Sequence, residues 1–123
     1  MAANKVVHFG PVALTASVAN ILNPGTTTGG TNMPANSGNL YFIVRHIRLV
    51  NKTSSAATIS MYVGVTGGSA AGTEFLGTAL SIAANSAYDW YGMLRLDTTD
   101  FLTGLASAVT TITFEAEGEV GIN

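Results

Sequence analysis

Two neighbouring stretches of the sequence, 39–51 and 57–65, limit the fold more than any other feature. The first is dense in β-branched and aromatic side chains, which suit the pleated surface of a sheet. The second alternates apolar residues with small or polar ones, the period of a strand that buries one face. Turn-favouring residues at 51–55 separate them, so we expect two long strands folded back on each other. The residues expected to face inward are Ile43, Ile47, Leu49, Ile59, Met61, Val63 and Val65.

Segments of similar character flank this pair, with turn signals between them and no convincing helix. The segment 12–22 fits either one helical face or an alternating strand. Its flanking prolines and the β context favour a strand. The predicted strands are 5–9, 12–22, 39–51, 57–65, 74–83, 88–96, 101–106 and 110–122. We therefore expect an all-β fold, a single-domain antiparallel β-sandwich or jelly roll of about eight strands.

The 123 residues suit one domain. We expect an N-terminal arm or short strand at 1–11 and a single β-sandwich domain at 12–123, with a long loop at 23–38. A loop longer than about a dozen residues is uncommon in a compact domain unless it is functional or disordered. It is either a plain surface loop or an arm that becomes ordered against a neighbouring subunit. In the second case Thr27, Asn32 and Met33 are interface candidates.

The composition excludes several classes of function. Charged residues make up 10% of the chain, against about 25% in ordinary domains, and only five are basic, which argues against direct nucleic-acid binding. The absence of cysteine removes disulfides, thiolate metal sites and cysteine nucleophiles. No apolar run approaches the roughly eighteen residues that cross a membrane, and no signal segment follows Met1. A weakly charged surface of small polar residues favours a component of an assembly.

Carboxylates recur on one face of the last predicted strand, at Glu115, Glu117 and Glu119. The simplest interpretation is a solvated face whose charge discourages edge-to-edge pairing. A second is electrostatic matching to a basic neighbour, such as Arg45 and Arg48 of another subunit or a different protein. Calcium chelation is a third, weaker interpretation, because such sites usually draw their oxygens from converging loops rather than one strand.

Aromatic residues cluster in the predicted strand 88–96. Alternation places Tyr88 and Trp90 on the inward face with Leu94 and Leu96. Tyr91 and Met93 fall on the opposite face, where they are the best hydrophobic interface candidates, since aromatic residues and Met are enriched in interfaces. An exposed Tyr in a cleft would instead suit a carbohydrate-binding module.

No arrangement of residues suggests catalysis. His8 and His46 lack the spacing of a metal-ligand motif, and no serine lies in a nucleophile-elbow context. The glycine pairs at 29–30 and 67–68 lack the Lys-Ser/Thr of a phosphate-binding loop, so they are interpreted as turns. We therefore predict no catalytic residue, no cofactor, no metal site and no enzymatic activity.

Several motifs in order along the chain resemble a known class of proteins. They are LT at 14–15, YFIVRHIRLVN at 41–51, TISMYVG at 58–64, WYG at 90–92 and DFLTG at 100–104. Together they resemble the small β-sandwich structural proteins of tailed bacteriophages, the head-decoration (cement) proteins and related virion proteins. The resemblance covers most of the chain from about residue 10 onward, and the long loop departs from it.

The resemblance implies a non-enzymatic virion structural protein, made in the host cytoplasm. It would bind the major capsid protein on the outer capsid surface, or other virion subunits, and stabilise the particle. It would form a homo-oligomer, with a trimer favoured, and contact neither nucleic acid nor membrane. The alternatives are a minor tail, head-completion or fibre-associated subunit and, less in keeping with the sequence, a carbohydrate-binding module.

Overall fold

A computed structural model describes residues 4–29, 39–76 and 78–122. The described residues form eight strands and no helix. The strands are β1 (Lys5–Ala13), β2 (Ala19–Leu22), β3 (Leu40–Asn51), β4 (Ala57–Gly64), β5 (Leu80–Ile82), β6 (Ser86–Leu96), β7 (Phe101–Ala106) and β8 (Ile112–Ile122). This confirms the prediction of an all-β chain.

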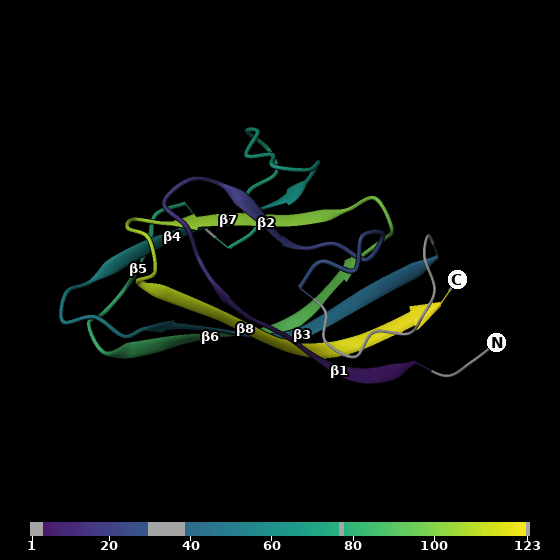
Figure 1. The fold of residues 1–123 in the computed structure, drawn as a ribbon, viewed down its shortest axis with the longest axis horizontal. Helices are drawn as coiled ribbons and strands as arrows, with labels where there is room; N and C mark the ends of the chain where they lie inside the picture. Colours follow the sequence, from purple (N-terminus) through teal and green to yellow (C-terminus); the bar gives the residue numbers. More distant parts are fainter. Residues whose placement is uncertain (1–3, 30–38, 77, 123) are drawn as a thin grey trace.

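The strands form two antiparallel sheets packed face to face, seen as the lower and upper layers of Figure 1. One sheet has the order β1-β8-β3-β6 and the other has the order β2-β7-β4-β5. Each strand of the first half pairs with its counterpart from the second half, as in one long hairpin rolled into two layers. The predicted single-domain antiparallel β-sandwich is confirmed.

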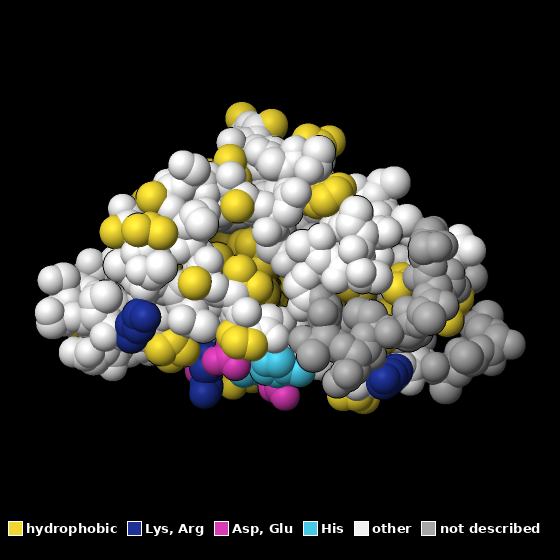
Figure 2. Space-filling view, in the orientation of Figure 1, with side chains coloured by type: hydrophobic (Ala, Val, Ile, Leu, Met, Phe, Trp, Pro, Cys, Tyr) yellow, Lys and Arg dark blue, Asp and Glu magenta, His cyan; other side chains and the backbone are white. Residues whose placement is uncertain are grey.

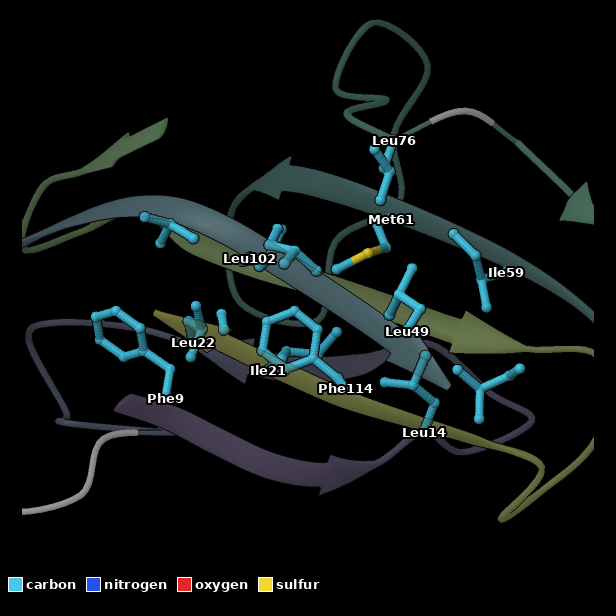
Figure 3. Close-up of a cluster of buried hydrophobic side chains, with 14 of the residues drawn as sticks. Phe9, Leu14, Ile21, Leu22, Leu49, Ile59, Met61, Leu76, Leu102 and Phe114 are labelled. Carbon is cyan, nitrogen blue, oxygen red and sulfur yellow. The ribbon is translucent and has the colours of Figure 1, made fainter. Parts of the chain in front are cut away.

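One apolar core fills the space between the two sheets (Figure 3). Three phenylalanines anchor it, and each is fully buried: Phe9 from β1, Phe42 from β3 and Phe114 from β8. The rings of Phe9 and Phe42 lie 4.8 Å apart between centroids, at a tilted angle that aromatic pairs prefer. The first strand is therefore part of the core.

The expected pairing of 39–51 with 57–65 is wrong, because β3 and β4 belong to different sheets. The side chain of Asn51, which is fully buried, holds the corner between them. It donates hydrogen bonds to the carbonyl oxygens of Ser55 and Ile82 and accepts one from the backbone N–H of Thr53. Alternation shows only that a strand has one buried face. Because both sheets turn their buried faces to the same core, alternation does not show which sheet a strand belongs to.

The inward residues of β3 change phase in the middle of the strand. Phe42 and Val44 are buried before the change, and Ile47 and Leu49 are buried after it. The pairing register with both neighbouring strands shifts between Val44 and His46, which puts two consecutive side chains on the outer face. The prediction that Ile43 faces inward is therefore wrong, since it is only half-buried. Val65 was also misplaced, because it lies beyond β4 and is 71% exposed.

Two other predicted strands have different limits. The segment 12–22 is not one strand, because β1 continues to Ala13 and β2 starts at Ala19 in the opposite sheet. The strand predicted at 74–83 is reduced to β5, three residues long. Ahead of it, Glu74 forms an isolated bridge with Tyr62, and the ring of Phe75 meets Trp90 edge-on with centroids 5.2 Å apart. This contact links the two sheets at one side of the sandwich.

The first part of the predicted long loop is a tight turn. Asn23 and Thr28 form an antiparallel bridge, and the buried side chain of Asn23 donates hydrogen bonds to the carbonyl oxygens of Thr98 and Asp100. Thr27 lies at its exposed tip with a positive φ of 55°. The other two candidates in this loop, Asn32 and Met33, lie outside the described residues.

Candidate functional site

The outer face of the β1-β8-β3-β6 sheet carries most of the charged side chains of the chain, and we call it the charged face. Figure 2 shows charged and histidine side chains gathered over the lower layer. The strands of the other sheet, β2, β4, β5 and β7, contain no charged residue. The residues of the charged face are His8, Arg45, His46, Arg48, Asp89, Arg95, Glu115, Glu117 and Glu119. The sandwich is therefore chemically asymmetric.

Two arginines on this face pair with carboxylates of the same chain. The Nε of Arg45 lies 2.7 Å from an oxygen of Glu119, and the Nε of Arg48 lies 2.8 Å from an oxygen of Asp89. The hydrogen bond from Arg45, together with one from Asn4, lowers the pKa of the Glu119 carboxyl. Arg45 and Glu119 therefore pair within one sheet of the same chain, and the matching of the glutamates to another subunit or protein stays a prediction.

Among the carboxyl groups of the charged face, Asp89 has the most strongly lowered pKa. Hydrogen bonds from Arg48, first, and from His46 hold its pKa at about 2, below the ordinary value of 3.8. The same contact raises the pKa of the Arg48 guanidinium. The strand register explains the pairing, because Arg48 and Asp89 lie directly opposite each other on β3 and β6.

His46 lies between two carboxylates and against an aromatic ring. Its Nε2 is 2.8 Å from an oxygen of Asp89, and its Nδ1 is 3.3 Å from an oxygen of Glu117. A doubly protonated imidazole can donate to both, whereas a neutral ring can donate to only one. The ring also stacks on Tyr91, with centroids 4.6 Å apart and planes 10° apart. His46 thus ties β3 to β6 and β8 on the outer face.

A shallow hollow of about 300 Å³ lies beside this histidine. Its lining residues are His8, His46, Arg48, Glu115, Ala116 and Glu117. The Nε2 of His8 approaches an oxygen of Glu115 at 3.5 Å across the β1–β8 pair. Within the described part of the chain, no group of three or more acidic, histidine or cysteine side chains is arranged to hold a metal ion.

The glutamate strand lies inside its sheet. β8 is flanked by β1 on one side and β3 on the other. The expectation that Glu115, Glu117 and Glu119 protect a sheet edge is therefore wrong. Alternation correctly placed the three carboxylates on one face but contains no information about which strands become edges.

Apolar side chains stand among these charges. Tyr91 is 71% exposed and Met93 is 66% exposed, and both lie on the outer side of β6, as alternation predicted. Val6 of β1 is 80% exposed near the opposite edge of the sheet. Trp90 points the other way and packs against the core, also as predicted. The charged face therefore offers apolar anchors within a polar surround.

A scan against protein-family models and a search of curated proteins both found no match to this chain. Within the described residues, no helix is long and apolar enough to cross a membrane.

The sequence analysis did not predict His8 as a partner of Glu115, nor His46 as the centre of a network. Their outward-facing positions opposite glutamates become visible only once strand neighbours are known.

Proposed function

We propose that this protein is a non-enzymatic structural subunit of a bacteriophage virion, a decoration protein that binds the outer capsid surface through its charged face. The observation that carries the proposal is the exposure of Tyr91 and Met93 amid side chains already paired within the chain. Its assignment to a virion rests on the resemblance described above.

The chemistry of the charged face suits protein binding. Aromatic residues, Met and Arg are enriched in interfaces, and this face combines Tyr91 and Met93 with Arg45 and Arg48. The arginines are held by carboxylates of the same sheet, so their positions are set before a partner arrives. Such preorganisation lowers the entropy lost on binding. A partner can cover the apolar anchors while the ion pairs form the polar surround.

The opposite sheet is a weaker candidate for recognition. Its strands bear no charge, and the connection between β4 and β5 covers part of it. That connection is held by a hydrogen bond from the Thr103 hydroxyl to the carbonyl oxygen of Gly68 and by one from Asn20 to Thr66. An uncharged and partly covered surface offers fewer groups that discriminate between partners.

The first experiment measures the copy number of the protein in purified particles by quantitative mass spectrometry against the major shell protein. Hundreds of copies in a simple ratio to the shell subunit support decoration. A handful of copies would replace decoration by a tail, head-completion or fibre-associated role. Absence from particles would overturn the proposal, and binding on a glycan array would then favour a carbohydrate-binding module.

A second experiment tests the docking face. Tyr91→Ala and Met93→Ala should each weaken attachment to particles stripped of this protein by roughly tenfold or more, as truncation of an interface anchor does. Val65→Ala is the matched control, because Val65 is equally exposed at 71% and lies outside the charged face. Equal attachment by all three variants would exclude the charged face as the docking surface.

A further inference from the structure

The four sheet edges of this sandwich differ in how well they are protected. β2 and β5 are only four and three residues long, and short edge strands resist pairing with other chains. β1 contains Pro11 and a register shift between Phe9 and Val12, both of which interrupt an edge. β6 is eleven residues long and contains no proline, and its pairing with β3 shifts register once, between Tyr91 and Leu94. It is the edge best suited to accept another strand.

The free side of β6 is a template for strand addition. β6 pairs with β3 from Ser86 to Tyr91 and from Leu94 to Leu96, with a register shift at Gly92 and Met93. Within the described part of the chain no strand pairs with its other side. An edge strand presents a row of backbone N–H and C=O groups to solvent. The alternation of β6 is unbroken, with Trp90 and Leu94 packed against the core and Tyr91 and Met93 outward. A second strand that pairs with β6 would therefore extend the sheet with its apolar side unbroken.

We propose that β6 pairs antiparallel with β6 of a second copy of this chain, about a two-fold axis at Gly92. In this register Asp89 lies opposite Arg95 of the second copy, and Tyr91 lies opposite Met93 of the second copy. By symmetry each pair occurs twice. Opposite charges and apolar partners that face each other across an antiparallel pair stabilise it. On the inner side, Trp90 lies opposite Leu94, so the apolar layer also continues across the axis.

Other registers match less well. Side chains stay on their proper faces only when outward residues pair with outward residues, which leaves registers that differ by steps of two residues. Centring the axis on Tyr91 places Asp89 opposite Met93 and Arg95 opposite Ala87. Centring it on Met93 places Asp89 opposite Asp97 and so brings like charges together. The Gly92 register matches both the charges and the apolar residues of β6.

The pairing would join two four-stranded sheets into one continuous sheet of eight strands. The two charged faces would then lie side by side with both copies of Tyr91 near the axis. This proposal uses the same two side chains, Tyr91 and Met93, as the proposed docking face, but it is tested on the isolated protein, so either proposal can fail without the other. It also differs from the trimer implied by the resemblance, so the two predict different masses.

Disulfide cross-linking tests the register. The chain has no cysteine, so the variants Tyr91→Cys and Met93→Cys each introduce a single thiol. Directly opposite residues in an antiparallel pair have Cα atoms about 4.5–5.5 Å apart, within disulfide reach. A mixture of the two variants should oxidise to a dimer of twice the 12.6 kDa monomer mass. Each variant alone should not, because like positions are about 7–8 Å apart, at or beyond the limit.

Charge substitutions at the same positions supply a matched pair of variants. Tyr91→Lys with Met93→Lys places lysines opposite each other, whereas Tyr91→Lys with Met93→Glu places opposite charges there. Both lose the same exposed side chains, so folding should be equally affected. Analytical ultracentrifugation should show a roughly tenfold or greater weakening of the dimer for the first relative to the second. A monomeric or trimeric wild type, equal cross-linking of single variants, or equal dimerisation of the two charge variants would overturn the proposal.

Discussion

Arg48 and Asp89 lie directly opposite each other on neighbouring strands, and the guanidinium meets the carboxylate through two hydrogen bonds of 2.8 and 3.2 Å. His46 Nε2 donates to the same carboxylate oxygen that Arg48 Nε contacts. Asp89 is therefore the point where the charged face connects its β3 and β6 residues. The low pKa of its carboxyl is the measurable consequence of this geometry.

Acid should weaken the fold through Asp89. Its pKa is about 2 in the folded chain, below the ordinary 3.8 that applies when the chain is unfolded. The stabilisation by ionised Asp89 is therefore present above about pH 4 and is lost as the pH falls through about 2. The free energy of unfolding of Asp89→Asn should be lower than that of wild type above this window. The two values should converge below it, in denaturant titrations at a series of pH values.

The cause of that pKa can be tested separately. Arg48→Ala removes the larger contribution, so the pKa of the Asp89 carboxyl should rise towards 3.8 in a carboxyl NMR titration. Arg45→Ala is the control, because Arg45 pairs with Glu119 instead. An unchanged pKa of Asp89 in Arg48→Ala would show that this pairing does not form in solution.

The first strand should contribute to stability as a core element. Phe9→Ala removes a fully buried ring in contact with Phe42 and should lower the free energy of unfolding by about 3–5 kcal/mol. Val6→Ala in the same strand changes an 80% exposed side chain and should have an effect within about 0.5 kcal/mol. Chemical denaturation measures both. A small effect for Phe9→Ala would mean that residues 5–13 behave as a detachable arm.

The corner between the sheets depends on Asn51. Asn51→Ala leaves the buried carbonyl oxygen of Ile82 and the N–H of Thr53 without their side-chain partner. The free energy of unfolding should fall by about 2–3 kcal/mol, because buried polar groups without partners are costly. Lys52→Ala, next in sequence and exposed, should change stability by less than about 0.5 kcal/mol. Similar values for both variants in urea titrations would contradict a structural role for this side chain.

Strand β8 should tolerate no side chain at Gly118. A Cβ atom built there meets the backbone carbonyl of Ile43 on β3, so Gly118→Ala should destabilise by about 1–3 kcal/mol as the strands move apart. At Gly64 the nearest atom to such a Cβ, in Thr73, is 3.4 Å away, an ordinary contact. Gly64→Ala should be neutral or stabilising by up to about 1 kcal/mol, because alanine loses less backbone entropy in a strand. Thermal unfolding of the pair measures the difference in sign.

The sequence-based predictions were correct where they depended only on neighbouring residues along the chain, and they failed where they depended on contacts between distant strands. Alternation in 88–96 correctly separated Trp90 from Tyr91 and Met93 because the direction of each side chain is set by its own backbone. The same rule failed at Ile43, because the register shift between Val44 and His46 reverses the phase without any turn residue to mark it. The candidate site was found only in pieces for the same reason. Its arginines, histidines and carboxylates come from four strands, and no spacing along the chain connects them.

The sequence by itself determined that this chain is an all-β sandwich, where most of its strands lie and, for most of them, which side of the strand is apolar. These properties depend on neighbours one or two residues away. Only the tertiary structure decided that β3 and β4 separate into different sheets and that Arg48 meets Asp89. Both sheets bury their apolar sides in one shared core, so local hydrophobicity cannot specify the partner of a strand. The packing of segments that are distant in sequence decides which strands pair, and this pairing brings the residues of the charged face together.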